Sequence, residues 1–224
     1  MPFRKTPLVN GEIYHVFNRS TGSIPIFTNK REYERFIFGI NYYRHKIIPV
    51  KLSLLKILSK EERGKILNDM INKDDLHNDL ICYCIMPTHY HFVLKQLHDG
   101  GINNFLRLVS NSYSHYYNKK HDRSGSVFGG RFKSVHIETD EQLLHVVRYI
   151  HLNPYSSYIV KGFKELESYP YSSLNEYLGN SVFNICQKNL VMDYFKTAER
   201  YKKFVFNQAE YQKSLEKIKH LIFK

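Results

Sequence analysis

Two histidines one residue apart, His89 and His91, lie in the stretch IMPTHYHFVLKQ, whose other residues are typical of a buried strand. In a β-strand, residues i and i+2 project from the same face, so both imidazoles are expected on one face and Tyr90 on the other. Their spacing, about 6 to 7 Å along the strand, allows two neutral imidazoles to share one metal ion. Taken alone, such a pair more often occupies ordinary, partly exposed sheet positions.

The stretch HVVRYIHLNP adds Tyr149 and Asn153, which lie one helical turn apart on a single face. A tyrosine hydroxyl can attack phosphorus, but its unperturbed pKa is about 10, so phenolate formation near pH 7 costs roughly 4 kcal/mol. A divalent cation held by His89, His91 and the side-chain oxygen of Asn153 would offset part of this cost and stabilise a transferring phosphoryl group. With 18 tyrosines in the chain, a packing role for Tyr149 remains the alternative.

A basic loop with glycines, KKHDRSGSVFGGRFKS, separates these two groups in the sequence. Its cations are expected to bind a nucleic-acid backbone, and they are Lys119, Lys120, Arg123, Arg131 and Lys133. Its glycines allow a ligand to approach the backbone closely, and Phe128 and Phe132 are expected to offer stacking faces. A solvated basic loop is the alternative.

The elements that must position these residues follow from turn signals and hydrophobic periodicity. The patterns predict strands over 12–20, 79–86, 90–97 and 134–139, and helices over 29–46, 102–121 and 140–153. Pro154 disfavours helix at Asn153, so the last helix should end about there. This order, β-α-β-β-α-β, is typical of the ferredoxin-like arrangement. The segment 47–78, with a helix near 60–71, is predicted to be an insertion.

The composition of the whole chain limits the possible partners. A net charge of +12 favours a polyanionic partner, and 42% hydrophobic residues are enough for a core. No run of 18 apolar residues and no signal peptide are present, so no membrane association is expected. The cysteines form no disulfide framework, and Cys82 and Cys84 fit core positions better than metal ligation. A reducing, cytoplasmic location is the expectation.

Four stretches together resemble the single-tyrosine HUH transposases, most closely the REP-associated tyrosine transposase group. They are YHVFNR, CIMPTHYHFVL, RSGSVFGGRFKS and VVRYIHLNPYSS, and their order and spacing agree over about 11–173. The resemblance implies an α+β, ferredoxin-like (RRM-like) palm with an antiparallel sheet and an added helix that carries the catalytic tyrosine. This domain would span 1–178, with the insertion at 47–78, and a helical, basic C-terminal extension would span 179–224.

The resemblance also implies roles for single residues. His89 and His91 match the family's metal-binding pair, Tyr149 matches its nucleophile, and Asn153 occupies the polar position that can complete the metal site. Related transposases can place an acidic ligand three residues before the first histidine, where this chain has Met86, which cannot serve as a hard-oxygen ligand. The third ligand is therefore Asn153 or water. Mn²⁺ or Mg²⁺ fits such a set of imidazole and oxygen ligands.

The function expected from these observations is that of a DNA strand transferase that forms a 5′-phosphotyrosine link to single-stranded, hairpin-bearing DNA. Arg19, at the end of the first motif, is expected to contact DNA with the basic loop. Related transposases include homodimers that exchange the tyrosine helix, as well as monomers, and the sequence leaves both open. Two other functions remain: a hairpin-binding module for DNA or RNA without catalysis, and a metal-dependent phosphoesterase that uses water.

Overall fold

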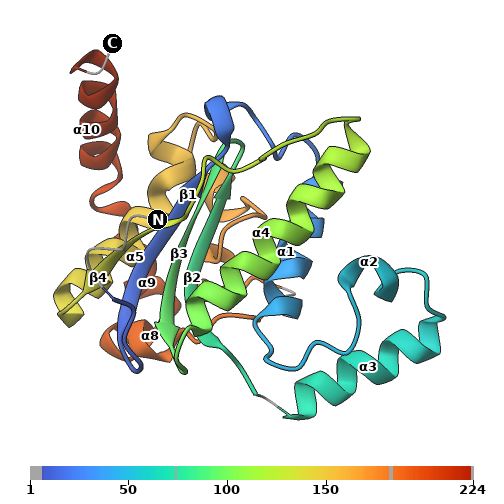
Figure 1. Ribbon diagram of the computed structural model, residues 1–224. Helices are drawn as coiled ribbons and strands as arrows, with labels where there is room; N and C mark the ends of the chain where they lie inside the picture. The colour runs from blue at the N-terminus through green and yellow to red at the C-terminus, as the bar shows by residue number, and fades with distance from the viewer. Residues whose placement is uncertain (1–6, 74, 182–183, 223–224) are drawn as a thin grey trace.

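A four-stranded antiparallel sheet forms the centre of the fold in the computed structural model, which describes residues 7–73, 75–181 and 184–222 (Figure 1). The spatial order is β2-β3-β1-β4, and the strands are β1 (Ile13–Arg19), β2 (Asn78–Met86), β3 (His89–Gln96) and β4 (Lys133–Ile137). Helix α1 (Lys30–Tyr43) follows β1, and α4 (Gly101–Lys120) follows β3. The expected ferredoxin-like palm with an antiparallel sheet is therefore confirmed.

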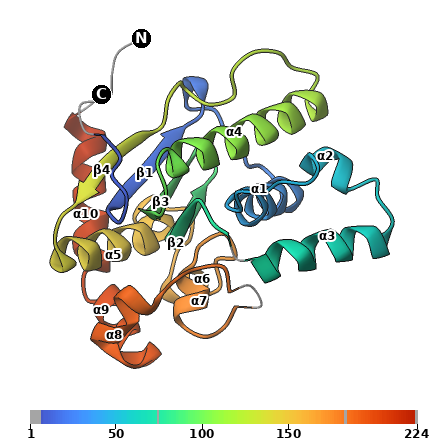
Figure 2. The same cartoon turned by 60° about the horizontal axis from the view of Figure 1, so that its bottom comes forward.

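The two faces of the sheet carry different side chains, because neighbouring residues of a strand point to opposite sides. One face, which includes Tyr14 and Phe92, packs against α1 and α4. The other face is covered by α5 (Asp140–Ser156) and by helices that follow it (Figure 2). Cys82 and Cys84 are fully buried under α5, which confirms the core position predicted for both.

Helices after α5 continue the layer on this second face. They are α6 (Phe163–Glu167), α7 (Leu174–Tyr177), α8 (Asn189–Phe195), α9 (Ala198–Phe206) and α10 (Ala209–Ile222). Val191 and Tyr201 lie in the same apolar cluster as Ile150 of α5. His151 of α5 is fully buried and hydrogen-bonded to Tyr201 Oη (2.6 Å) and Ser173 Oγ (2.8 Å). Residues on both sides of the predicted boundary at 178 thus share one core.

Helix α5 ends later than its sequence predicts. The expected end was at Asn153, but the helix includes Pro154 and continues through Ser156. The missing N–H of proline costs little in the last turn, where the Asn153 carbonyl oxygen still accepts a hydrogen bond from Ser157 (3.0 Å). Tyr155 is buried in the cluster beneath α5, as is the residue before Asn153. Tertiary packing therefore outweighs the local preference against helix before proline.

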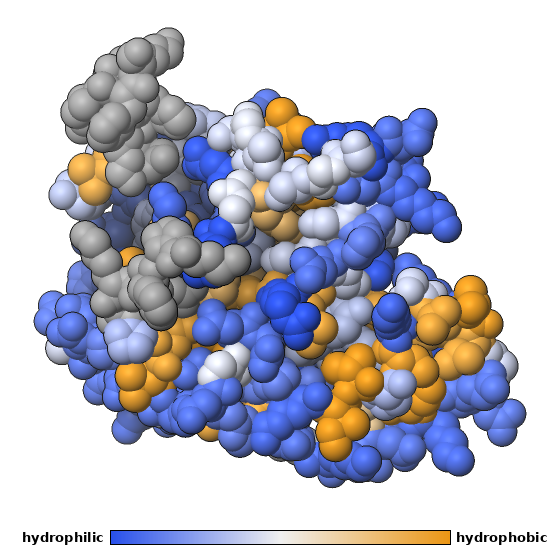
Figure 3. Space-filling view, in the orientation of Figure 1, coloured by the Kyte–Doolittle hydropathy of each residue, from blue (hydrophilic) through white to orange (hydrophobic). Residues whose placement is uncertain are grey.

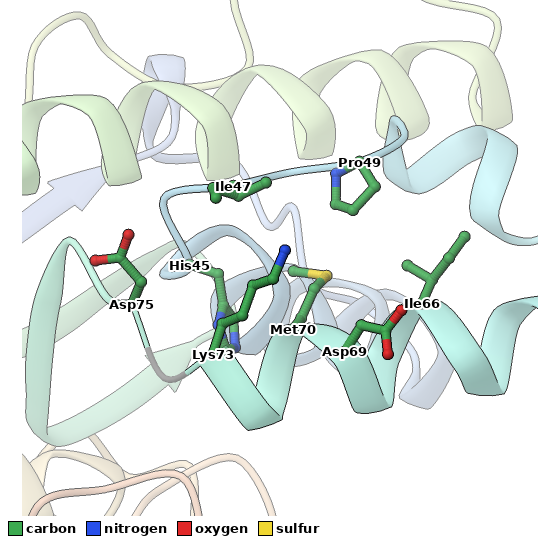
Figure 4. A pocket seen from close by; sticks show the side chains of 8 residues that line it. All are labelled: His45, Ile47, Pro49, Ile66, Asp69, Met70, Lys73 and Asp75. Carbon is green, nitrogen blue, oxygen red and sulfur yellow. The ribbon is translucent and has the colours of Figure 1, made fainter.

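The predicted insertion forms a small helical unit between α1 and β2. It contains α2 (Leu52–Leu55) and α3 (Lys60–Lys73). A cavity of about 140 Å³ lies between α3 and the chain that enters the unit, with Met70 on one side and Pro49 on the other (Figure 4). An ion pair between Lys46 and Asp75 (2.7 Å) joins the two ends of this inserted unit.

Exposed apolar side chains gather on the outside of the inserted unit (Figure 3). The most exposed are Ile57 (78%) and Ile71 (63%). Across the residues that the structure describes, no helix combines the length and the apolar character needed to cross a membrane.

Candidate active site

An open cavity brings together the residues singled out for chemistry. Its volume is about 890 Å³, and it lies between α5 and one end of the sheet. His89 and His91 of β3 line it together with Tyr149 and Asn153 of α5. The strand and the helix predicted to supply these groups therefore bring all four to one place.

The two histidines project from the same face of β3, as their spacing predicts. Their ring centroids lie 5.2 Å apart and the ring planes are nearly perpendicular, at 84°. Tyr90 points to the opposite face, where its ring stacks on Phe92 with a centroid distance of 4.6 Å. The hydroxyl of Thr88 lies 2.8 Å from His89 Nδ1, so a metal ion at this ring would be bound through Nε2.

A third histidine, which sequence reasoning missed, contacts His91. The Nε2 atom of His15 on β1 lies 2.9 Å from His91 Nδ1, and the two rings stack at a centroid distance of 5.2 Å. Strand pairing places Phe17 opposite His91, and His15 follows two residues away on the same face. The alternation in YHVFNR puts His15 and Phe17 on one face, but it does not reveal which strand lies beside them.

Burial keeps these imidazoles neutral. It lowers the pKa of His15 to about 4. Burial also lowers the pKa of His91 well below its ordinary value, with smaller contributions from the positive charges of His15, His89 and Arg19. Because a metal ion binds the neutral imidazole, the site requires no deprotonation of these rings near pH 7.

Tyr149 is half-buried and presents its ring to the histidines. Its centroid lies 5.9 Å from that of His91 with the planes at 89°, and 6.3 Å from that of His15. From α10, Gln212 Nε2 donates a hydrogen bond to the Tyr149 carbonyl oxygen (3.0 Å) and to Ser156 Oγ (3.2 Å). The C-terminal helix therefore supports the turn of α5 that carries the tyrosine.

Asn153 provides the remaining candidate oxygen ligand. It is 4% exposed, and its Nδ2 atom has no hydrogen-bond partner among the described residues. The amide can rotate by half a turn and exchange its nitrogen for its oxygen, so this group can offer oxygen to a cation. Within the described part of the chain, no three His, Cys, Asp or Glu side chains form a metal-binding group. A fitting donor set therefore consists of two imidazoles, one amide oxygen and water.

The six cations predicted to bind DNA fall into separate places. Three of them line the same cavity as Tyr149, namely Arg19, Arg131 and Lys133. Lys119 and Lys120 line another cavity on the opposite side of the sheet, and Lys120 pairs with the buried carboxylate of Glu32 (2.6 Å). The Arg123 guanidinium lies 5.6 Å from the centroid of the Tyr117 ring. Contact of each cation with DNA stays a prediction.

The loop between α4 and β4 is bound to the end of β1. The Gly129 N–H donates to the Arg19 carbonyl oxygen (2.8 Å), and Gly130 has a φ of 98°, a conformation that favours glycine. Phe128 is only 4% exposed and belongs to the core under α1 and α4, so the expectation that it offers a stacking face is wrong. Burial of the whole apolar ring in the core is more favourable than leaving the ring exposed to solvent. Phe132 is partly buried against the same core.

Comparison with known proteins reveals a shared fold. No protein-family model matches the chain, and no curated protein matches it. Among solved structures, a REP-associated tyrosine transposase bound to a REP hairpin is similar, with a TM-score of 0.53 and 14% sequence identity. The match covers 83% of this chain and 89% of that one. At this identity the similarity establishes the fold alone. The chemistry has to be inferred from the residues of the site.

Proposed function

We propose that this protein cleaves and rejoins single-stranded DNA beside a hairpin, with Tyr149 as the nucleophile. The main observation is that Tyr149 and Asn153 line one cavity with the two histidines and with basic residues, although the helix and the strand that carry them are distant in the sequence. The fold shared with a hairpin-bound tyrosine transposase supports this proposal. A net charge of +12 supports it too, because cations on phosphates release counterions.

In the proposed reaction, Tyr149 Oη attacks a phosphorus atom of the DNA backbone. A bond from Oη to phosphorus forms, the bond from phosphorus to the 3′-oxygen breaks, and the phenolic proton is lost while the 3′-oxygen gains one. The products are a 5′-phosphotyrosine link and a free 3′-hydroxyl. A second 3′-hydroxyl can then reverse the step and join new ends, because the covalent intermediate conserves the phosphodiester bond energy.

His89, His91 and Asn153 are the residues that would hold a divalent cation, Mn²⁺ or Mg²⁺. When bound, such an ion polarises a phosphate oxygen and stabilises the charge that develops on the transferred group. His15 is a positioning residue, because its hydrogen bond to His91 Nδ1 leaves Nε2 as the nitrogen for the metal. Arg19 and Arg131, at the same cavity, would bind the neighbouring backbone phosphates.

The tyrosine in this proposal acts beside the histidines of its own chain. Leu143, Val147 and Ile150 of α5 are buried in one cluster with Cys82 of β2, on the face that carries His91. This packing holds Tyr149 beside the histidines of the same chain, and the proposal is therefore that the tyrosine acts within one chain.

The test is formation of a covalent adduct. Labelled single-stranded DNA with a hairpin is incubated with the protein and Mn²⁺ and separated on a denaturing gel. The wild type is expected to form an adduct that Tyr149→Phe abolishes, whereas Tyr211→Phe, a change at a tyrosine that is 63% exposed on α10, should leave it intact.

The other outcomes identify the other functions. Cleavage that persists in Tyr149→Phe would indicate a phosphoesterase that uses water. Binding without cleavage by a metal-loaded sample would indicate a hairpin-binding module.

A further inference from the structure

A cavity on the opposite side of the sheet from Tyr149 has a strongly basic lining. Its volume is about 850 Å³, within the range of sites for nucleotide-sized ligands. It lies between α1, α4 and the inserted unit, and Figure 2 shows α2 beside α1 and below the C-terminal half of α4. Its cations are Arg35, Lys51, Lys56, Lys119 and Lys120, of which Lys120 is paired with Glu32, and no described acidic residue lines the cavity itself. We call it the interhelical cavity.

Arg35 is the buried cation of the interhelical cavity. It is 7% exposed, it donates a hydrogen bond to Ser112 Oγ (3.0 Å), and its guanidinium lies 5.5 Å from the centroid of the Tyr116 ring. The groups around Arg35 are hydroxyls and an aromatic ring. Among the residues that the structure describes, no carboxylate forms an ion pair with Arg35. A buried charge without a counter-charge is costly, so an anion in this cavity would be strongly stabilised.

Tyr116 adds an unsatisfied hydrogen-bonding group to the same lining. Its hydroxyl oxygen is buried and has no partner within the described residues. A buried polar group of this kind usually has a partner in the functional complex, such as a ligand or an ordered water. The hydroxyl can donate to an anionic oxygen beside the guanidinium of Arg35.

The cations of the cavity also disfavour one another's charge. Burial lowers the pKa of Arg35. Burial lowers the pKa of Lys56 as well, and the charges of Arg35 and Arg31 lower it further. A bound anion would act in the opposite direction on both groups.

We propose that the interhelical cavity is a phosphate-binding site for the DNA backbone, separate from the site of Tyr149. The guanidinium of Arg35 and the hydroxyl of Tyr116 would bind non-bridging phosphate oxygens, while Lys51 and Lys56 add positive charge from the inserted unit. The identity of the ligand as DNA rests on the proposed function. The recognition of phosphate rests on the cavity alone.

The position of the cavity connects it to the Tyr149 site. Lys119 and Lys120 lie at the C-terminal end of α4, where the basic loop begins, and Arg131 and Lys133 follow that loop into the cavity of Tyr149. The loop therefore carries cations of one cavity before it and cations of the other cavity at its far end, so that one DNA molecule could contact both. The inserted unit, which the sequence left without a role, supplies two of these cations.

The test measures how salt weakens DNA binding. Fluorescence anisotropy of a labelled hairpin with single-stranded flanks is followed against NaCl concentration, with full-length protein carrying Tyr149→Phe so that cleavage cannot alter the probe. Replacing Lys51 and Lys56 by Gln is expected to lower the slope of log K against log salt by about 1.5 and the affinity about tenfold, since each phosphate contact contributes about 0.7 to 0.9 to the slope.

The matched control is the pair Lys60→Gln and Lys65→Gln, at exposed lysines of α3 in the same inserted unit. This pair makes the same change of charge outside the cavity and should leave slope and affinity unchanged. Equal slopes and affinities for the two double variants would overturn the proposal. Arg35→Lys, which keeps the charge but loses the planar fork, should weaken binding without lowering the slope, with thermal melting to verify folding.

Calorimetric titration with inorganic pyrophosphate separates DNA from free phosphate compounds. Saturable pyrophosphate binding that disappears in the Lys51 and Lys56 variant, with an unchanged DNA slope, would assign the cavity to small phosphate compounds and overturn the DNA proposal. The covalent adduct reports on Tyr149 alone. If the protein forms the adduct but the Lys51 and Lys56 variant has an unchanged salt slope, only the inference about the cavity is contradicted. If the slope changes but no adduct forms, only the proposed strand transfer is contradicted.

Discussion

His15 Nε2 lies 2.9 Å from His91 Nδ1, on the face of the sheet that Tyr149 borders. This contact joins β1 to β3 through the buried ring of His91 and the partly buried ring of His15. It also determines which nitrogen of His91 is directed at the cavity, because one ring nitrogen of each histidine is used in the contact. Partners of this kind orient metal ligands in many sites, and their loss typically weakens metal binding by 10- to 100-fold.

The first prediction concerns His15. The variant His15→Ala should bind Mn²⁺ about 10- to 100-fold more weakly, because the His91 ring loses the partner that orients it. Titration of free Mn²⁺ by its electron paramagnetic resonance signal measures this without any reaction. The control is His136→Ala, since His136 on β4 pairs with Glu12 (2.7 Å) instead. Equal Mn²⁺ affinity in His15→Ala and wild type would show that the contact has no orienting role.

The second prediction concerns Asn153 as an oxygen ligand. Asn153→Asp should bind Mn²⁺ about tenfold more tightly, because it adds a negative charge beside the cation, and Asn153→Leu should bind it more weakly at similar volume. The same Mn²⁺ titration provides both values. If the two variants match the wild type, water occupies the position assigned to Asn153.

The third prediction concerns which chain supplies the tyrosine. A mixture of Tyr149→Phe protein with His91→Ala protein should form no DNA adduct, because the packing of α5 on its own sheet leaves no intact site in either chain. The adduct gel described above measures this. Recovery of adduct in the mixture, at about a quarter to a half of the wild-type level, would instead demonstrate exchange of α5 between subunits.

The fourth prediction concerns the junction of α5 with the C-terminal helices. Tyr201→Phe should lower the free energy of unfolding by about 1 to 3 kcal/mol, because it leaves the buried His151 Nδ1 without its hydrogen bond from the described network. Urea denaturation measures the loss. Tyr211→Phe removes a hydroxyl from a ring that is 63% exposed and should change the stability by less than about 0.5 kcal/mol. Similar values for the two variants would contradict a structural role for this bond.

The fifth prediction concerns the buried carboxylate of Glu32. Burial opposes its ionisation, but hydrogen bonds from Lys120, from the amide and hydroxyl of Thr28 and from His121 outweigh burial and lower its pKa to about 2. A pKa below the unfolded value of 4.5 stabilises the fold above pH 4.5, and this contribution is lost as the pH falls towards 2. Its size is on the order of 3 kcal/mol.

Unfolding by urea at pH 6 and pH 3 tests this assignment. Glu32→Gln should be less stable than wild type at pH 6, and the difference should shrink at pH 3 because the wild-type carboxylate loses its advantage there. Glu61→Gln, at an exposed glutamate in the first turn of α3, should show no such pH dependence. A Glu32→Gln difference of equal size at both pH values would contradict the lowered pKa.

The sequence by itself determined the elements and the faces of the main residues. The two-residue spacing of His89 and His91 decides their common face, because the period of a strand is two, and the four-residue spacing of Tyr149 and Asn153 does the same on a helix. The order of strands and helices could likewise be predicted from the sequence, because each element follows from the periodicity and the turn residues of a short segment. These are the parts of the fold and of the site that were predicted correctly.

Only the tertiary structure decided which residues from different elements meet. The contact of His15 with His91 depends on the register between β1 and β3, and the interhelical cavity depends on how the inserted unit packs beside Arg35. Packing also buried Phe128 and extended α5 past Pro154, against their local patterns. These four features have one physical reason. Burial against distant segments contributes more free energy than the conformational preferences of neighbouring residues, and a short stretch of sequence does not contain those distant segments.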